Sequence, residues 1–255
     1  MRKLSDSTAL FTTMYGFIAL NGEVKLQILE LLKEGPCTFE ELVRYTGKAK
    51  STISVHLRDL SSCKLVEERL NNCDRRKKEY ILTSCCLGSS QQPVQKHYKC
   101  ILNNFSYLKN NDHNKTDFFM SMYHAIRFGF EAYGLNHYPI MKKIGFDIGT
   151  SLAHNFNSSN ISSLFYDISE FWSENELGNL EFFEDSGINI RVTDCIGCST
   201  MPVMNKKLCS FEEGIFEGLL TSKIDHVAKV TEAECCGTGH PHCLFFVQLK
   251  KTIES

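Results

Sequence analysis

Residues 51–83, STISVHLRDLSSCKLVEERLNNCDRRKKEYILT, decide the fold of the N-terminal part of the chain. Ile53, Leu57 and Leu60 recur at helical spacing, which predicts one buried face of a helix. The opposite face then carries small or polar side chains that fit the major groove of DNA. They are Ser51, Thr52, Ser54, Val55 and Arg58. We therefore expect a DNA recognition helix here.

A basic hairpin is expected directly after this helix. The strand predicted over residues 66–70 turns through residues 71–74 into a run of cations and returns over residues 80–82. Cations at the tip of a hairpin can bind DNA phosphates without reading the base sequence. The run consists of Arg75, Arg76, Lys77 and Lys78.

The residues before the recognition helix predict two further helices. The apolar face of residues 24–32 ends at Gly35-Pro36, because proline has no amide hydrogen to donate. Thr38 and Glu41 have the spacing of a capping box, which indicates the start of a short helix. Helix, helix, turn, recognition helix and two-stranded wing follow in order, and this order predicts a winged helix-turn-helix domain.

Within this domain we expect the recognition helix and the wing to contact DNA. His56 is the residue with an open alternative, because a histidine at this place could instead pack or cap. The expected DNA-binding residues are Lys50, Ser51, Thr52, Ser54, His56, Arg58, Arg75, Arg76, Lys77 and Lys78.

Charge is divided unevenly along the chain. With 255 residues, of which 42% are hydrophobic, the chain is long enough for two globular domains. Residues 1–85 hold 14 Lys+Arg and 11 Asp+Glu, a net charge of +3, whereas residues 86–255 hold 14 and 19, a net charge of −5. DNA phosphates would repel the acidic part, so we expect it to sense or to dimerise.

The domain boundaries follow from composition and periodicity. We expect the winged helix over residues 1–88, a linker with a connecting helix (94–108) over residues 89–115, and an α+β sensor domain over residues 116–255. The linker prediction depends on SCCLGSSQQP at residues 84–93, which has no periodicity and ends in proline. A second break is expected at residues 110–114.

The N-terminal segment, residues 9–20, is mostly apolar and follows Arg2-Lys3, as in a signal peptide. Thr12, Thr13 and Tyr15 dilute the apolar run and no small-residue cleavage site follows, so we expect a helix in a cytoplasmic protein. A second copy of the chain would cover this helix in a homodimer, although it could also pack only on its own domain. No later segment is long and apolar enough to span a membrane.

The sensor region reads as helices followed by strands. The predicted helices cover residues 118–133, 138–156, 161–172 and 208–220, and the predicted strands cover residues 180–183, 188–192, 227–233 and 244–249. We expect the last two strands to pair.

Twelve cysteines are the second informative feature of the chain. A reducing cytosol favours thiols, metal ligands or transient disulfides. Cys209, Cys235 and Cys243 with Glu232 offer three thiolates and a carboxylate, which suits four-coordinate zinc.

Two features of the sequence complicate this candidate site. His240 and His242 lie between the last two cysteines and are competing ligands. On an ideal strand Glu232 and Cys235 would face opposite sides, so the site requires a bend or bulge near Glu234. Buried thiols without a metal are the alternative.

Other cysteines are candidates for redox chemistry. Cys195 and Cys198 have the spacing of a redox dithiol or of half a metal site. Cys236 adjoins the candidate metal site and could act as a resolving thiol or be an ordinary strand residue. Cys63 and Cys73 belong to the DNA-reading part, where oxidation could block DNA directly.

Two family resemblances add to these readings. STISVHLRDL at residues 51–60 resembles the recognition helix of the ArsR winged-helix repressors, and this likeness covers about residues 20–85. CSFEEG at residues 209–214, EAEC at residues 232–235 and GHPHCLFF at residues 239–246 resemble the carboxy-terminal half of the 4-vinyl reductase domain. Gly145–Gly149 resembles that domain's glycine-containing helix, so the second likeness covers about residues 116–250.

The combination is similar to the methanogen-specific redox regulators of archaea. The resemblance implies Zn²⁺ bound by Cys209, Glu232, Cys235 and Cys243, and DNA binding that responds to thiol oxidation. We expect a homodimer on a palindromic double-stranded DNA site, in which oxidation or metal loss acts through the connecting helix.

Three other functions are alternatives. The sensor could bind a small aromatic or apolar ligand, or it could respond to metal directly. For an enzyme, the sequence lacks a glycine-rich nucleotide motif, a nucleophile elbow and a spaced acid/base pair. Zinc with four protein ligands would also have no open position for a substrate, so we expect no catalysis.

Overall fold

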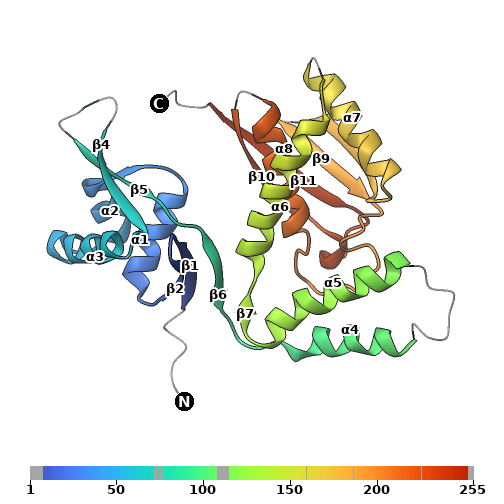
Figure 1. Cartoon of the computed structure of the whole chain (residues 1–255), viewed down its shortest axis with the longest axis horizontal. Coiled ribbons are helices and arrows are strands. Elements are labelled where there is room, and N and C mark those ends of the chain that lie inside the picture. The colour runs from blue at the N-terminus through green and yellow to red at the C-terminus, as the bar shows by residue number, and fades with distance from the viewer. Residues whose placement is uncertain are drawn as a thin grey trace. The chain divides into compact units, whose positions relative to one another are not determined.

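The computed structural model describes residues 8–71, 74, 77–107, 115–158, 160–185, 187–224 and 226–251. These residues fall into two compact units (Figure 1). One unit holds the chain up to residue 104 together with residues 125–137, and the other holds residues 105–124 and the chain from residue 138 onward.

The first unit contains the predicted winged helix. Three helices are followed by a three-stranded antiparallel sheet in the order β3-β5-β4. The helices are α1 (Glu23–Lys33), α2 (Phe39–Thr46) and α3 (Lys50–Ser62), and the strands are β3 (Cys37–Thr38), β4 (Val66–Leu70) and β5 (Lys78–Leu82). The wing is therefore the β4-β5 hairpin, with β3 as a short third strand.

Local sequence signals set the ends of these helices. The Thr38 hydroxyl accepts a hydrogen bond from the Glu41 amide at 3.3 Å, and the Glu41 carboxylate accepts one from the Thr38 amide at 2.8 Å. This confirms the predicted capping box. Gly47 ends α2 in the left-handed conformation, with φ +65°, which glycine adopts without a steric penalty.

The core of the winged helix confirms the periodicity of the recognition helix. Ile53, Leu57 and Leu60 are at most 3% exposed and pack in one hydrophobic cluster. Ile28 and Leu42 bring the buried faces of α1 and α2 into the same cluster. Burial of these side chains fixes α3 with its polar face outward.

The predicted N-terminal helix is wrong. Residues 9–20 form a hairpin of β1 (Ala9–Thr13) and β2 (Gly16–Leu20), in which Thr13 pairs with Gly16 across a two-residue turn. Ala9 and Phe11 are buried while the residues beside them are more exposed, so the apolar pattern has the period of a strand. Gly16, with φ +121°, allows the turn.

The linker prediction is also wrong for part of its range. Residues 86–90 form β6 (Cys86–Ser90), which pairs with β1, and β7 (Leu135–Asn136) adds to its other edge. The resulting sheet has the order β2-β1-β6-β7. The absence of periodicity is explained by a β-bulge in β1 opposite this strand and by the small residues that β6 contains.

Two long helices follow. They are α4 (Gln95–Tyr107) and α5 (Lys115–Ala132), close to the helices predicted over residues 94–108 and 118–133. The break predicted at residues 110–114 lies outside the described residues. Within the described part of the chain, every helix is too short or too polar to span a bilayer.

The second unit is an antiparallel sheet with helices, which confirms the predicted α+β class. The strand order is β10-β11-β9-β8. The helices are α6 (Tyr138–Leu152), α7 (Ile161–Glu174) and α8 (Ser210–Lys223), with 3₁₀ turns η1 (Ala153–Asn155) and η2 (Cys236–Thr238). The strands are β8 (Asn179–Glu184), β9 (Ile188–Thr193), β10 (His226–Glu234) and β11 (Cys243–Lys251), and the predicted pairing of the last two is confirmed.

Helix α8 packs on α6 and on β10 (Figure 1). Glycines on both helices allow the backbones to touch. A Cβ atom on Gly145 would lie 2.1 Å from the Phe211 carbonyl oxygen, and one on Gly214 would lie 2.0 Å from the Lys142 carbonyl oxygen. No other residue type fits at such a distance, so α6 and α8 are joined backbone to backbone.

Candidate metal centre and DNA interface

Five buried cysteines of the second unit converge in one place, and we call them the cysteine cluster. Each is at most 1% exposed. Two follow β9, one precedes the first residue of α8, one lies between β10 and η2, and one opens β11. In that order they are Cys195, Cys198, Cys209, Cys235 and Cys243.

The sulfur atoms of the cluster are in contact with one another. Cys209 Sγ lies 3.6 Å from Cys243 Sγ and 3.8 Å from Cys195 Sγ. Cys235 Sγ lies 3.9 Å from both Cys209 Sγ and Cys243 Sγ, and Cys198 Sγ lies 3.1 Å from Cys243 Sγ. Four sulfurs around one zinc ion at ordinary Zn–S distances would be about 3.8 Å apart. The cluster could therefore hold a metal ion.

Two sets of four residues have ligand atoms within 4.8 Å of one another. The mixed set is Cys209, Glu232, Cys235 and Cys243, and it contains the residues predicted from the sequence. The all-thiolate set is Cys195, Cys198, Cys209 and Cys243. Cys209 and Cys243 belong to both sets.

A β-bulge brings Glu232 and Cys235 to the same side of the sheet. Glu232 pairs with Phe245 and Glu234 pairs with Leu244, so the register shifts between the two glutamates. This confirms the bulge predicted near Glu234, and without it the mixed set could not form.

The histidines left open as competing ligands lie elsewhere. His242 Nε2 is 2.9 Å from the Glu234 carboxylate, and His240 Nδ1 is 3.0 Å from the Thr238 hydroxyl. Neither histidine belongs to the mixed set or to the all-thiolate set.

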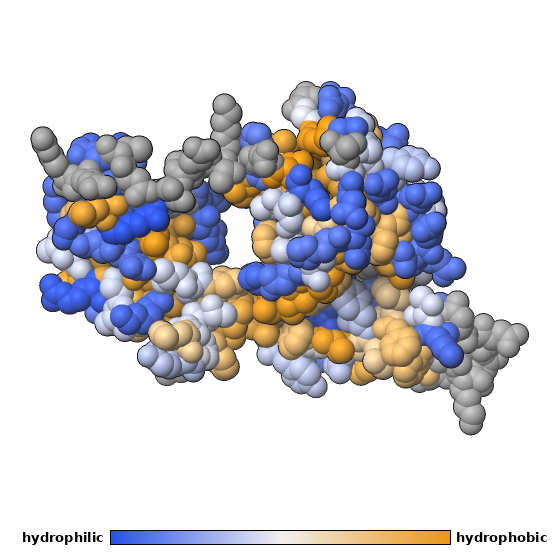
Figure 2. Space-filling view, turned by 45° about the horizontal axis from the view of Figure 1, so that its top comes forward, coloured by the Kyte–Doolittle hydropathy of each residue, from blue (hydrophilic) through white to orange (hydrophobic). Residues whose placement is uncertain are grey.

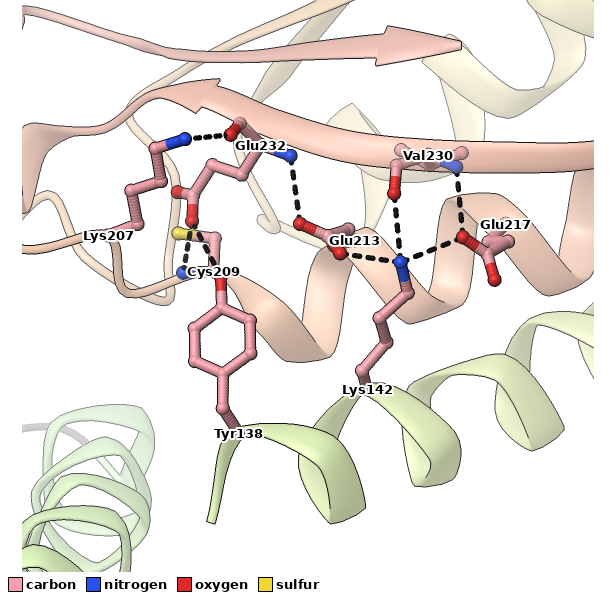
Figure 3. Close-up of polar contacts among 8 residues, drawn as sticks. All are labelled: Tyr138, Lys142, Lys207, Cys209, Glu213, Glu217, Val230 and Glu232. Atoms are coloured by element: carbon pink, nitrogen blue, oxygen red, sulfur yellow. Dashed lines mark hydrogen bonds and ion pairs between the residues drawn. The ribbon is translucent and has the colours of Figure 1, made fainter. Parts of the chain in front are cut away.

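Glu232 lies beside the cysteine cluster with one carboxylate oxygen occupied and one free (Figure 3). Its Oε2 accepts hydrogen bonds from the Cys209 amide at 3.1 Å and from the Tyr138 hydroxyl at 3.4 Å. Its Oε1 is buried without a hydrogen-bond partner among the described residues. A buried oxygen of this kind is costly unless a cation or a proton satisfies it, so the residues present fit a metal ion.

A second polar layer ties the cluster to α6 (Figure 3). Lys142 Nζ lies 2.6 Å from Glu213 and 2.8 Å from Glu217, and it donates to the Val230 carbonyl oxygen at 2.9 Å. Glu213 Oε2 also accepts from the Glu232 amide at 2.8 Å. Burial lowers the pKa of Lys142, but the two carboxylates outweigh burial and raise it, so the lysine remains charged.

Protons in the cluster are unevenly distributed. Burial, assisted by the negative charge of Cys235, raises the pKa of Glu232 to about 9. Contact with Cys198 raises the pKa of Cys235, but hydrogen bonds from Cys209 and Cys243 bring it down to about 6. Hydrogen bonds from Cys195 and the other cysteines lower the pKa of Cys198. Thiolates thus coexist with protonated neighbours, a state that a bound cation would replace by releasing protons.

Sequence reasoning treated Cys195 and Cys198 as a separate pair, whereas the structure brings both into the cluster. The signal was their distance along the chain from β9, because Val192 in that strand pairs with Cys243. Without the β9-β11 pairing, no spacing in the sequence connects the two sites. Cys236 is half-buried and outside both sets, and burial with the nearby thiolate of Cys198 raises its pKa to about 12.

The recognition helix presents the predicted polar face to solvent. Lys50, Ser51, Ser54 and Arg58 are exposed, and Thr52 and His56 are half-buried. The His56 Nδ1 atom is buried without a hydrogen-bond partner in the described part of the chain. Contact of these side chains with DNA stays a prediction.

The wing is only partly described. Arg75, Arg76 and Cys73 lie outside the described residues. Lys78 is exposed but forms an ion pair of 2.6 Å with Glu68, and Lys77 lies 3.7 Å from Asp74. Acidic neighbours thus partly offset these two positive charges. Cys63 is exposed just after the last residue of α3.

Comparisons with known proteins agree with this architecture. The family described as "Bacterial regulatory protein, arsR family" matches residues 22–68, and the 4-vinyl reductase domain matches residues 188–249. The uncharacterized protein MJ1642 of Methanocaldococcus jannaschii is 34% identical over 117 residues, which are 43% of this chain and 70% of that protein. The uncharacterized protein MJ0150 of the same organism is 29% identical over 133 residues, 51% of this chain and 76% of that protein.

Two solved structures are similar at lower levels. A vinyl-4-reductase family protein from M. jannaschii is 18% identical with a TM-score of 0.38, covering 60% of this chain and 92% of that one. The phenol-responsive sensory domain of the transcription activator PoxR, with phenol, is 18% identical with a TM-score of 0.36, covering 42% of this chain and 62% of that one.

The predicted ArsR-like helix-turn-helix and 4-vinyl reductase-like domain are thus confirmed by the matched families. The chain belongs to the family of MJ1642, and it joins an ArsR-type DNA-binding helix-turn-helix to a 4-vinyl reductase domain.

Proposed function

We propose that this protein is a redox-responsive, homodimeric transcription regulator whose 4-vinyl reductase domain binds Zn²⁺. The observation that carries the proposal is the convergence of buried cysteines, with Cys198 Sγ and Cys243 Sγ 3.1 Å apart. Thiols this close can exchange between reduced and disulfide states. The proposed protein acts in the cytoplasm, where reducing conditions keep thiols available, and it has no catalytic role.

The mixed set is the proposed zinc site. Three thiolates and one carboxylate are ligands that four-coordinate zinc takes in proteins. The buried Oε1 atom of Glu232 would gain a partner there. Bound Zn²⁺ would neutralise the thiolates and hold the ends of β10, α8 and β11 together.

Oxidation would act on the ligand set through Cys243. In the proposed step Cys198 and Cys243 lose two electrons and two protons as an S–S bond forms, and one hydrogen peroxide molecule accepts both pairs and becomes two molecules of water. Cys243 then no longer has a thiolate to offer. The mixed set loses a ligand, and Cys209, Glu232 and Cys235 are left to rearrange.

Tyr138 provides a route from the cluster to the rest of the chain. It is the first residue of α6, and its hydroxyl donates to Glu232 Oε2. The chain passes from the first compact unit to the second between residues 137 and 138. A change in the position of Glu232 would therefore act where the chain leaves the DNA-binding unit. We propose this route in addition to the connecting helix.

DNA binding by two copies is part of the proposal. Two recognition helices about 34 to 36 Å apart would read successive major grooves of a palindromic site. Because residues 9–20 form a hairpin, the dimer face is better sought on α5. Phe118, Met122, Ile126 and Phe130 recur every four residues on α5 and are 36% to 59% exposed. Hydrophobic residues are also visible at the surface in Figure 2.

A gel-shift titration of the full chain on DNA from its own promoter region tests the redox proposal. We expect at least a tenfold weaker or tighter dissociation constant after peroxide than under reductant, a difference of about 1.4 kcal/mol. Zinc content is measured on both samples and should fall on oxidation. The change should disappear in Cys243→Ser and persist in Cys236→Ser, the matched control at a cysteine outside both sets. DNA affinity that is independent of redox state would contradict the proposal.

Direct metal sensing is a second candidate, because the same buried donors could respond to metal supply alone. It predicts that DNA affinity follows added Zn²⁺ at constant reductant and does not respond to peroxide while zinc is bound. A response to a small apolar ligand stays a prediction of the sequence.

A further inference from the structure

We infer that the cysteine cluster is a two-metal site, in which the thiolates of Cys209 and Cys243 bridge two divalent cations. Cys195 and Cys198 would complete one cation's ligands, and Glu232 and Cys235 would complete the other's. This inference rests on the proposed zinc site and extends it by a second ion of the same class.

The two sets of ligands share an edge. Cys209 Sγ and Cys243 Sγ, 3.6 Å apart, belong to both the all-thiolate set and the mixed set. Each set by itself has the four donors that a tetrahedral cation takes. Two tetrahedra with a common edge are the geometry of two cations bridged by two thiolates, since a thiolate sulfur has enough lone pairs to bind both.

The number of donors exceeds what one cation can use. Five thiolates and one carboxylate would carry a charge of −6, because each contributes −1. One divalent cation leaves −4, and two leave −2. All six residues are at most 1% exposed, so each uncompensated charge is costly. With one cation, the two donors outside its ligand set would have to keep protons, whereas two cations use every donor.

Groups around the cluster favour the remaining negative charge. Cys209 directly precedes α8, whose N-terminus carries partial positive charge. The Gly237 amide donates to Cys235 Sγ at 3.4 Å. Lys207 Nζ donates to the Glu232 carbonyl oxygen. These contacts come from three different segments around the mixed set.

Sulfur spacing points to bare cations rather than an iron–sulfur cluster. Inorganic sulfide in such a cluster lies between the cysteine ligands and separates them. Here the cysteine sulfurs are 3.1 to 3.9 Å apart, which is direct contact. The space among them admits ions of the size of Zn²⁺ and leaves none for sulfide.

Titration of the reduced, metal-free full chain with Co²⁺ tests the inference without a mutation. Co²⁺ takes tetrahedral thiolate sites and gives sulfur-to-cobalt charge-transfer and visible d–d absorption. We expect these bands to rise to two equivalents. Bridging thiolates couple the two Co²⁺ spins, so the paramagnetic resonance signal per cobalt should fall by at least half between one and two equivalents. Saturation at one equivalent would overturn the inference.

The matched variants separate the two halves of the site. Cys195→Ser/Cys198→Ser should bind one ion per chain and show no spin coupling, with the circular dichroism of the parent chain. Cys236→Ser should bind two, because that side chain lies outside both sets. Zinc measured per chain by mass spectrometry should give the same two, one and two.

The outcomes distinguish this inference from the proposed function. One ion in both the parent chain and Cys195→Ser/Cys198→Ser overturns the second metal and keeps the proposed zinc site. One ion in the parent and none in that folded variant overturns both metal assignments, because a single ion then uses the all-thiolate set. Two ions without spin coupling overturn the bridging by Cys209 and Cys243.

Discussion

The two units have cores of different chemistry. The winged-helix core consists of hydrophobic side chains such as Ile28, Leu42 and Leu60, which are fully buried. The core of the 4-vinyl reductase unit encloses the cysteine cluster and Glu232 with similar burial. Burial of hydrocarbon stabilises the first by itself, whereas burial of thiolates and a carboxylate requires compensation. The comparison indicates that the DNA-binding unit folds independently of the chemical state that the other unit responds to.

Metal removal is the strongest way to break this comparison. A chelator should lower the stability of the 4-vinyl reductase unit by on the order of 10 kcal/mol at most, the apparent binding free energy of structural zinc in small peptides. Hydrogen exchange followed by mass spectrometry should then show faster exchange in β10 and β11 and unchanged exchange in α1 and α3. Equal acceleration in both units would mean that the cores are not independent.

Truncation of a side chain in the winged-helix core should give the next largest effect. Leu60→Ala should cost about 2 to 5 kcal/mol, since the side chain is fully buried and leaves a cavity. The cost should be the same with and without metal. Val55→Ala is the matched control in the same helix, because Val55 is 52% exposed, and it should change stability by about 0.5 kcal/mol or less. Denaturant unfolding with and without chelator measures all of these values.

Glu232 gives a pH dependence that is confined to the metal-free 4-vinyl reductase unit. Its pKa in the folded chain is about 9, above the ordinary 4.5, so the folded state keeps a proton that the unfolded state has lost. Stability is therefore greatest below pH 4.5 and falls as pH rises toward 9, by up to about 1.4 kcal/mol per unit. Glu232→Gln should lack this dependence.

The test compares the unfolding free energy of the metal-free parent chain and of Glu232→Gln at several pH values from 6 to 8. The variant should gain in relative stability as pH rises. With zinc bound the sign should reverse, because glutamine cannot supply the carboxylate ligand. A constant difference across this range would show that Glu232 is ionised in the metal-free fold.

The smallest expected effect is at the capping box of α2. Thr38→Ala removes the hydroxyl that accepts from the Glu41 amide, and it should cost about 1 kcal/mol. Thr38→Ser keeps the acceptor and should cost less. Thermal unfolding of the winged helix measures both, and the loss should be the same in reduced and oxidised protein. A redox-dependent loss would show that the two units are coupled in stability.

Local signals in the sequence predicted much of the fold. The period of Ile53, Leu57 and Leu60 identified the recognition helix, and Thr38 with Glu41 identified a helix start. The bulge near Glu234 followed from the requirement that Glu232 and Cys235 face the same side. In each case, neighbours along the chain determine the structure.

Pairings between distant segments were not predictable. The apolar run of residues 9–20 is compatible with a helix or a hairpin, and its pairing with β6 selects the hairpin. Cys195 and Cys198 join the candidate metal site only because β9 pairs with β11. Both contacts are between strands far apart in sequence, where periodicity carries no information about partners.

The glycine contacts between α6 and α8 have a mechanical consequence. Where side chains separate two helices, changes of rotamer absorb small displacements, but at Gly145 and Gly214 backbone meets backbone. The two helices must then travel as a single stiff lever. Cys209 lies at the start of one arm and Tyr138 at the start of the other. A displacement imposed on the sulfur end would reach the tyrosine end with little loss of amplitude.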